Sequence, residues 1–520
     1  MPVESACRPS NSARGTGIGL RLRCLGLAAC VVAATVQAQP PTEPDPFAAL
    51  DHGLRPSVIA AGQAPPRWSL AERMRHYHVP GVAIALVKNG EVVRAAGYGV
   101  REAGTQDKVD GDTLFSVGSI SKVATATTTL RLVAQGRLDL DRDVGDYLRR
   151  WKLPAAVADA SPPRVSLRML MSHTSGLGVH GFADYQPNEA LPTLVQVLDG
   201  QAPAKGEAVR FKHAPGAVVD YSGGGVTVEQ LALEDVSGQS LQALAQAQVF
   251  APLGMRRSTF ESPLSAARGN IAKAHDLDGD RVALPRGWES FGEGGASGLW
   301  TSANDLGRLV GALIKSYQGR GDFLPQPLAT AMMTEVSPSV FGLGPRLGGS
   351  GQSRYFFHMG ANESYLALME GYPETGDGYV VLTNASNGGV LIDEIRNALA
   401  DAIMPGARPP VRAVAQRLPP SPDFVGAYRL DPQTPMDLRR ATADNFDYPG
   451  FRVNVAGDTV ELLMAGREQP VRLQSLGPAR YVYAGLYTIV FDFRRDAWGK
   501  VRGLTVAIPE TDSVTYYLRE

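Results

Sequence analysis

The chain has 520 residues, which is long for one domain and predicts two or three. Hydrophobic residues make up 44% of the chain and charged residues 20%, a balance typical of globular proteins with sizeable cores. The formal net charge is -1 and Lys and Arg form no run, so the sequence predicts neither a nucleic-acid partner nor an anionic-membrane surface.

Residues 1–38 have the pattern of a signal peptide. Two arginines precede an apolar stretch from Cys24 to Val36, and Val36-Gln37-Ala38 has the small-residue pattern of a cleavage site. The stretch is too short to span a bilayer in the mature chain. We therefore expect an exported protein, periplasmic or secreted. A lipoprotein is the alternative, since the residues ending at Cys30 resemble a lipobox.

All cysteines of the chain lie within this segment: Cys7, Cys24 and Cys30. Cleavage after Ala38 leaves a mature protein without a thiol, so we expect neither a disulfide nor a cysteine nucleophile. Because the segment carries four arginines and one glutamate, the mature chain is mildly acidic.

Residues 39–66 are rich in Pro and Ala and are predicted to form a tether. Ser69 then begins a helix that runs to about His78. Two β-prone runs around Asn89-Gly90 predict a hairpin over residues 82–100. Helices are expected next, over residues 119–135, 166–173, 225–237, 239–249 and 302–317. The last expected elements of this part are strands 365–371 and 378–382 and a helix from about 390 to 403.

This order predicts an α+β fold for residues 67–405. A hairpin at the start and strands near the end indicate one antiparallel sheet built from both ends of the domain and flanked by helices. The helices between them predict a separate helical subdomain.

The C-terminal part has a different texture. Residues 406–422 form a Pro-rich linker. Residues 423–520 alternate in short β-prone runs, such as those on either side of Gly457-Asp458 and of Trp498-Gly499. About a hundred residues of this kind predict a small all-β barrel.

The central chemical feature is Ser119-Ile120-Ser121-Lys122. Helical spacing puts Ser119 and Lys122 on one face, one turn apart. A lysine beside a serine hydroxyl can accept its proton when the lysine is kept neutral. The Ser119 amide at the helix start would be an oxyanion donor. A Ser-x-x-Lys match alone is weak, but the uncharged residues 123–130 predict a buried helix.

Several motifs follow in order, and together they resemble one family. Ser119-x-x-Lys122 is joined by Tyr221-Ser222-Gly223 and by His358-Met359-Gly360. The segments Leu170–Leu177 and Gly295–Ser302 agree with two further signatures. The sequence is similar to the class C β-lactamase-like serine hydrolases, a group of penicillin-binding DD-peptidases, D-aminopeptidases and esterases. Its C-terminal part resembles the lipocalin-like domain appended to some of these hydrolases.

The resemblance implies catalytic roles for three residues. Ser119 would attack a carbonyl, with Lys122 as the general base for acylation. Tyr221 would relay a proton to the leaving group and later activate the deacylating water. The reaction would run through a covalent acyl-enzyme, with no metal or organic cofactor.

The resemblance also implies substrate contacts, with two departures from the family. His358 would bind substrate polar groups from a strand, where lactamases have Lys-Thr-Gly. The amide of Ala361, directly after Gly360, would be the second oxyanion donor. Gly223 stands where lactamases and DD-peptidases have an Asn that holds the substrate's acylamide. Both His358 and Gly223 weaken recognition of penicillin-like carboxylates and leave the acyl-transfer groups in place.

Three functions are consistent with these residues. The first is a hydrolase of small esters, amides or D-amino-acid peptides. The second is a β-lactamase or DD-peptidase, and the third is a non-catalytic binding protein. His173 is a possible triad base, but its segment resembles a structural turn in the family. The sequence makes no prediction about oligomeric state.

Overall fold

The structure is a computed structural model that describes residues 46–155, 163–186, 188–282, 288–414, 419–431, 450–464, 470–484, 488–508 and 513–520. These residues belong to one compact unit, Asp45–Glu520. The predicted signal peptide lies outside the described residues, so its cleavage stays a prediction.

The segment expected as a tether is structured from Pro46 onward, and that part of the expectation is wrong. It contains η1 (Pro46–Ala48), α1 (Ala49–His52) and β1 (Val58–Ala60). Its apolar side chains are buried in the same core as the central sheet, which is why a Pro- and Ala-rich composition does not leave it extended. β1 pairs in parallel with β10 (Val411–Ala413), a strand inside the predicted linker. The exact domain boundaries stay a prediction.

The predicted antiparallel sheet is present and has six strands in the order β3-β2-β9-β8-β7-β6. The strands are β2 (Gly81–Lys88), β3 (Glu91–Gly99), β6 (Arg346–Gly348), β7 (Tyr355–Asn362), β8 (Tyr365–Tyr372) and β9 (Asp377–Thr383). Asn89 and Gly90 both have positive φ, as the predicted Asn-Gly hairpin turn requires. The hairpin and the α+β fold class are confirmed.

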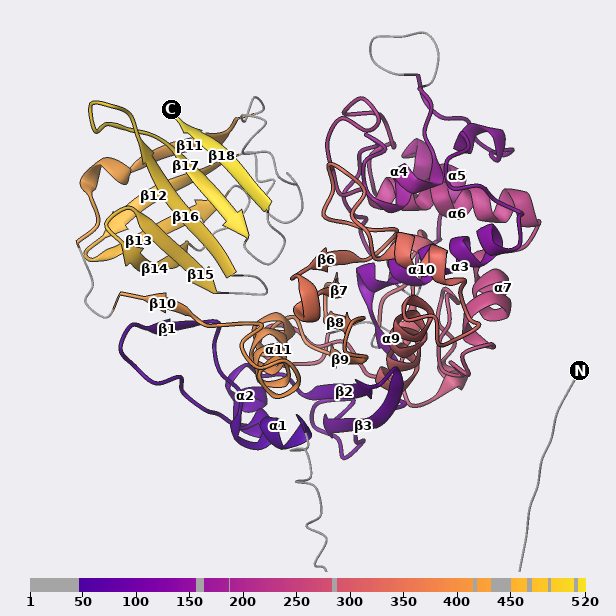
Figure 1. Cartoon of the computed structure of the whole chain (residues 1–520), viewed down its shortest axis with the longest axis horizontal. Coiled ribbons are helices and arrows are strands. Elements are labelled where there is room, and N and C mark those ends of the chain that lie inside the picture. The colour runs from indigo at the N-terminus through magenta and orange to yellow at the C-terminus, as the bar shows by residue number, and fades with distance from the viewer. Residues whose placement is uncertain are drawn as a thin grey trace, which may run out of the picture. The chain divides into compact units, whose positions relative to one another are not determined.

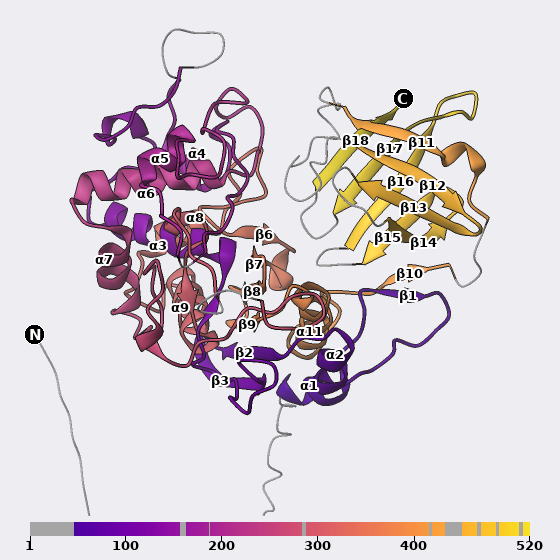
Figure 2. The same ribbon diagram turned by 180° about the vertical axis from the view of Figure 1, so that it is seen from behind.

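Two helices cover opposite faces of this sheet (Figures 1 and 2). On β2, Ala83, Ala85 and Val87 share a core with the apolar residues of α9 (Ala303–Tyr317). The alternate residues Val82, Ile84 and Leu86 share a core with α11 (Gly388–Ile403). A strand with both faces buried reads as a continuous apolar run, and β2 does so.

A helical region follows β3 in the sequence and contains the first motif. Its helices are η2 (Gly118–Ile120), α3 (Ser121–Ala134), η3 (Val144–Asp146), α4 (Leu167–Met171), α5 (Leu194–Asp199), α6 (Gly223–Ser237), α7 (Leu241–Ala245), the π-helical η4 (Gln246–Phe250), η5 (Ala266–Arg268), α8 (Gly294–Ser297) and α10 (Gln326–Met332). A short ribbon of β4 (Phe115–Ser116) and β5 (Trp300–Thr301) ties the start of this region to the start of α9.

The C-terminal part is a closed antiparallel barrel, as predicted. Its strands are β11 (Gly426–Leu430), β12 (Gly450–Ala456), β13 (Thr459–Met464), β14 (Val471–Gly477), β15 (Arg480–Ala484), β16 (Thr488–Arg495), β17 (Val501–Ile508) and β18 (Ser513–Arg519). Phe424, just before β11, stacks on Phe493 with ring centroids 4.0 Å apart, and the rings of Tyr428, Tyr481 and Tyr517 are almost fully buried.

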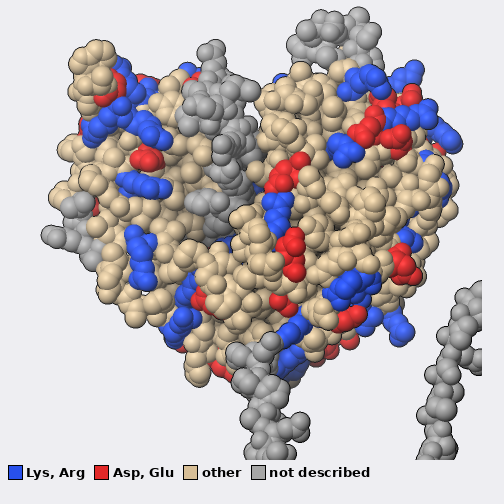
Figure 3. Space-filling model, viewed as in Figure 1, with Lys and Arg blue, Asp and Glu red and all other residues tan. Residues whose placement is uncertain are grey.

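The distribution of charge on the surface agrees with the near-zero net charge of the chain. On the face shown in Figure 3, Lys and Arg are interspersed with Asp and Glu rather than gathered into one patch. No helix within the described residues is both long and apolar enough to cross a membrane.

Candidate active site

The turn that carries Ser119 is shaped by the glycine before it. Gly118 has φ +47, and a Cβ there would lie 2.8 Å from the amide nitrogen of Ala361. The chain forms the 3-10 turn η2 from this glycine, and α3 begins only at Ser121. Ser119 therefore lies in the turn before the helix rather than in its first residue as expected, and it is half-buried.

Lys122 lies within proton-transfer distance of Ser119. Its Nζ is 3.0 Å from Ser119 Oγ and donates to the carbonyl oxygen of Ala296 at 2.8 Å. The lysine side chain is 3% exposed, so the prediction of a buried helix is correct. A buried amine beside a serine hydroxyl is the arrangement that general-base activation of that hydroxyl needs.

The segment Gly295–Ser302 holds this helix in place. The Thr125 hydroxyl donates to the carbonyl of Gly295 at 2.9 Å. The Ser121 hydroxyl donates to the carbonyl of Gly118 and accepts from the amide of Leu299, at 2.6 and 2.9 Å. These hydrogen bonds hold the start of α3, and with it Ser119 and Lys122, so the segment Gly295–Ser302 has a positioning role.

Tyr221 brings a phenol to the same place. The Lys122 Nζ lies 4.8 Å from the centroid of the Tyr221 ring. The ring is also 4.4 Å from that of His173 and 6.3 Å from that of His358, centroid to centroid. The side chain is 6% exposed. All three residues predicted to carry out the chemistry are therefore neighbours.

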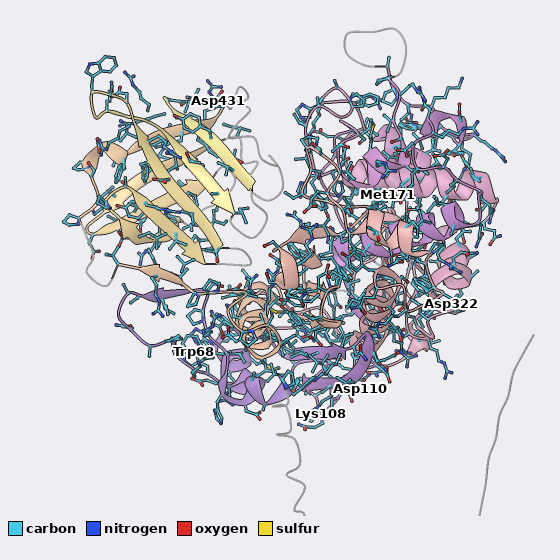
Figure 4. All side chains as sticks on the ribbon, in the orientation of Figure 1. Trp68, Lys108, Asp110, Met171, Asp322 and Asp431 are labelled. Carbon is cyan, nitrogen blue, oxygen red and sulfur yellow. The ribbon has the colours of Figure 1, made fainter. Side chains whose placement is uncertain are left out.

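His173 supports Tyr221 rather than Ser119. It has φ +59 and follows α4, as the expected structural turn requires. Its Nδ1 accepts a hydrogen bond from the amide of Ser222 at 3.2 Å. The lone pair of this nitrogen is therefore used to position the residue next to Tyr221. Burial, with Lys122 and His358 nearby, holds the pKa of His173 well below its usual value. Met171, two residues earlier, lies in the helical region (Figure 4), and its carbonyl accepts from the amide of Gly344 at 3.2 Å.

His358 lies on β7 and is 2% exposed. Its Nδ1 is 2.7 Å from the carbonyl of Met359, and because a carbonyl only accepts, this nitrogen carries the proton. Its Nε2 then carries a lone pair, and no hydrogen-bond donor among the described residues reaches it. Burial, then Arg346 and Lys122, lowers the pKa of His358 to about 3. His358 is neutral at neutral pH, as its unperturbed value also predicted.

The backbone after His358 presses against the nucleophile's turn. A Cβ on Gly360 would lie 1.8 Å from the carbonyl oxygen of Val117, so only glycine permits this approach. The Asn362 amide donates to the Ser116 hydroxyl at 2.6 Å. Ala361 thus lies beside the turn of Ser119, so the two residues whose amides were predicted as oxyanion donors are close together.

Gly223 is surrounded more closely than its lack of a side chain suggests. It begins α6, and its amide donates to the carbonyl of His180 at 3.2 Å. A Cβ there would lie 3.0 Å from that carbonyl oxygen and 3.1 Å from the ring of Phe182. The prediction described a missing Asn. The structure shows instead that the His180 carbonyl and the Phe182 ring occupy the space beside this position.

Three further residues at the site lie outside the sequence motifs and were not predicted. His180 lies 4.9 Å from Tyr221, ring to ring. Arg346 on β6 is buried beside His358. Glu293 is 1% exposed, and burial, reinforced by Asp184, raises its pKa to about 8 although Lys122 opposes the shift.

Comparison with known proteins agrees with this geometry. Residues 69–402 match the family described as Beta-lactamase. The chain belongs to the beta-lactamase family. Its matched region contains the Ser119 turn, Tyr221, β7 and the whole six-stranded sheet, and it ends before β10 and the barrel.

Two curated relatives of this beta-lactamase family member differ in name. Penicillin-binding protein 4 of Amycolatopsis lactamdurans is 33% identical over 200 residues, or 38% of this chain and 49% of the relative. Esterase EstB of Burkholderia gladioli is 30% identical over 287 residues, or 50% of this chain and 71% of the relative. The chain thus spans about half the length of the first and more of the second. The family is confirmed.

Solved structures confirm the fold. The structure described as SurE with D-Leu has a TM-score of 0.55 at 20% identity and covers 87% of this chain and 97% of its own. The octameric penicillin-binding protein homologue from Pyrococcus abyssi has a TM-score of 0.53 at 20% identity and covers 86% and 98%.

Proposed function

We propose that this protein is a serine hydrolase that acts through an acyl-enzyme on Ser119. The observation that carries the proposal is the 3.0 Å separation between Lys122 Nζ and Ser119 Oγ, inside a buried site. In the acylation step the Ser119 oxygen bonds to the substrate carbonyl carbon while Lys122 accepts the hydroxyl proton. The amides of Ser119 and Ala361 stabilise the resulting oxyanion.

The Tyr221 phenol completes both halves of the reaction. As the tetrahedral intermediate collapses, the bond to the leaving group breaks and the leaving oxygen or nitrogen takes a proton passed from Lys122 through Tyr221. In deacylation the same pair accepts a proton from water, whose oxygen bonds to the acyl carbon. The bond between that carbon and Ser119 Oγ then breaks, and Oγ takes the proton back from the pair as the acid product leaves. The Lys122 Nζ lies 4.8 Å from the centroid of the Tyr221 ring, so the two groups are neighbours in the site.

We further propose that the substrates are small and lack a carboxylate at the His358 end of the site. A neutral histidine with a free lone pair at Nε2 accepts a hydrogen bond and does not pair with an anion. At Gly223 no side chain is available to hold an acylamide. Losing one charge-assisted and one neutral hydrogen bond costs about 2–4 kcal/mol of transition-state binding. That is roughly thirty- to a thousandfold in kcat/KM.

Labelling of intact protein tests the nucleophile. A fluorophosphonate should add one adduct per chain, and Ser119→Ala should abolish both the adduct and esterase activity. Ser350→Ala, at an exposed serine, is the matched control and should keep both. Lys122→Ala and Tyr221→Phe should each slow acylation by a factor on the order of a hundred, and the losses should not add. An adduct on another serine would refute the assignment.

Substrate preference tests the proposed selectivity. Short-chain p-nitrophenyl esters should be hydrolysed with kcat/KM well above that of benzylpenicillin. The second candidate, a β-lactamase or DD-peptidase, has the penicillin-binding relative in its favour. Turnover of benzylpenicillin at rates equal to ester hydrolysis, or a stable penicilloyl adduct on Ser119, would favour that candidate instead.

Export remains part of the proposal. The apolar stretch from Cys24 to Val36 and the following small residues support cleavage after Ala38. N-terminal sequencing of protein from its native host tests this, and a lipid-modified start at Cys30 would contradict it.

A further inference from the structure

Three carboxylates that the hydrolase chemistry does not use converge next to the site. Asp184, Glu289 and Glu363 each place a carboxylate oxygen within 4.8 Å of the other two. Glu289 is 3% exposed, Asp184 is half-buried and Glu363 is exposed. The group therefore has one buried wall and one side open to solvent.

Backbone pairing brings these residues together from distant parts of the chain. Tyr185 and Ser290 exchange two backbone hydrogen bonds of 2.8 and 2.9 Å, which sets Asp184 beside Glu289. Glu363 lies in the tight turn between β7 and β8, two residues after Ala361. Its carbonyl accepts from the Ser386 hydroxyl at 2.7 Å, which holds the turn.

Electrostatic repulsion within this group is only partly relieved by Lys205, which lowers the pKa of Asp184 less than burial and Glu363 raise it. Burial and then the charge of Glu363 raise the pKa of Asp184 to about 6. Burial and the charges of Asp184 and Glu363 raise the pKa of Glu289 to about 8. Lys205 is near, but its ammonium group donates to the backbone carbonyl of Asp184 and to Glu189.

A separate observation concerns hydrogen-bond satisfaction. Both carboxylate oxygens of Glu289 are buried and have no hydrogen-bond partner of normal geometry within the described residues. The Ser364 hydroxyl, 0% exposed, lies close enough to Glu289 to lower the pKa of its carboxyl by hydrogen bonding, although no bond of normal geometry joins the two groups. Buried polar groups of this kind are nearly always satisfied by protein, water or an ion.

We propose that Asp184, Glu289 and Glu363 bind a divalent cation of the Ca²⁺ type, with the Ser364 hydroxyl and water completing its oxygen ligands. Ca²⁺ takes six to eight oxygens at about 2.3–2.6 Å, so oxygens on opposite sides of the ion lie up to about 5 Å apart. The separations here fall within that limit. Three carboxylates from three segments supply the charge, and the open side at Glu363 admits the ion and its waters.

The ion would stabilise the β7–β8 turn and the loop of Asp184 without taking part in bond breaking. It would join three segments that border the site and give the oxygens of Glu289 a partner. This inference does not depend on Ser119 being the nucleophile, because binding is measured on the resting protein.

Calorimetric titration of the full chain, freed of metal with a chelator, tests the site. CaCl₂ should bind at one ion per chain, and millimolar CaCl₂ should raise the melting temperature. Glu289→Gln should weaken binding at least tenfold and remove the thermal shift. Glu363→Gln, at an exposed position, should do the same where Glu289→Gln fails to fold.

Glu229→Gln is the matched control. Glu229 is also buried with a pKa raised to about 8, but burial alone raises it and its Oε1 accepts from the Thr129 hydroxyl at 2.6 Å. This variant should bind CaCl₂ as the parent does. Absence of binding at millimolar CaCl₂ and MgCl₂ would overturn the proposal. So would equal affinity in Glu289→Gln, or stabilisation by an alkylammonium salt in place of the metal.

Discussion

Replacing His358 by Gln should change how the stability of the folded protein depends on pH. His358 is buried and neutral in the folded protein, and its pKa is lowered to about 3. The groups that face it, Arg346 and Lys122, add positive charge, while the rings of Tyr221 and His173 exclude water. In the unfolded chain its pKa is about 6.5.

The sign follows from these two values. Above about pH 6.5 neither state binds a proton at His358, so the residue adds no pH dependence. As the pH falls below that value, the unfolded chain binds a proton at His358 and the folded chain does not. The free energy of unfolding therefore decreases until the pH reaches the folded pKa. At pH 5 the difference is about 1.5 pH units, or about 2 kcal/mol. Gln cannot bind this proton, so the variant escapes the loss.

Urea unfolding at pH 7.5 and pH 5 measures the effect. The variant also loses the bond to Met359, but that loss is the same at both pH values. The difference in unfolding free energy between parent and variant should therefore move by about 2 kcal/mol in favour of His358→Gln at the lower pH. His52→Gln, at an exposed position in α1, is the control and should show no such change. A difference independent of pH would refute the claim that His358 is buried and neutral.

Two further substitutions test the frame of the site. Gly118→Ala should abolish ester hydrolysis in a rate assay while the protein stays folded, because the added Cβ meets the Ala361 amide 2.8 Å away at a positive φ; retained activity would contradict the placement of that amide. Glu370→Gln should lower the unfolding free energy by about 3–5 kcal/mol, because Arg396 would stay buried without its carboxylate partner. Thermal unfolding measures this loss, and an unchanged midpoint would show that the pair is dispensable.

Local signals in the sequence predicted most of the fold. The Asn89-Gly90 turn fixed the first hairpin, because its two residues adopt positive φ readily. Ser302 was expected to begin a helix, and its hydroxyl accepts from the Asp305 amide at the start of α9. The barrel was predicted because alternation with a period of two needs no partner outside the segment to be seen.

What the sequence did not predict depends on tertiary contacts. The short elements of residues 46–60 have little local preference and form because their apolar side chains join the core behind the sheet. The start of α3 was predicted two residues too early. Helical spacing alone cannot predict that Gly118 packs against Ala361 and that a 3-10 turn precedes the helix. β6 has only three residues, too few to show an alternating pattern, and it forms by pairing with the neighbouring strand β7.

The residues of the candidate site also fall into a predicted and an unpredicted group. Ser119, Lys122 and Tyr221 were found because a fixed order of short motifs marks them. His180 and Arg346 stand outside any motif and reach the site only through loop and sheet packing. Glu293 is similar, since its burial and not its identity sets it apart.

Gly223 shows why the departures from the lactamase pattern have to be considered as a group. A glycine in place of Asn seems at first to leave an empty position that one substitution would refill. A Cβ at Gly223 would lie 3.0 Å from the carbonyl oxygen of His180 and 3.1 Å from the Phe182 ring, so an Asn there fits only if these neighbours shift slightly. The same loop brings the His180 ring against Tyr221. We therefore expect the loop and the neutral His358 together to weaken recognition of carboxylate-bearing substrates, and a single substitution at Gly223 not to restore it.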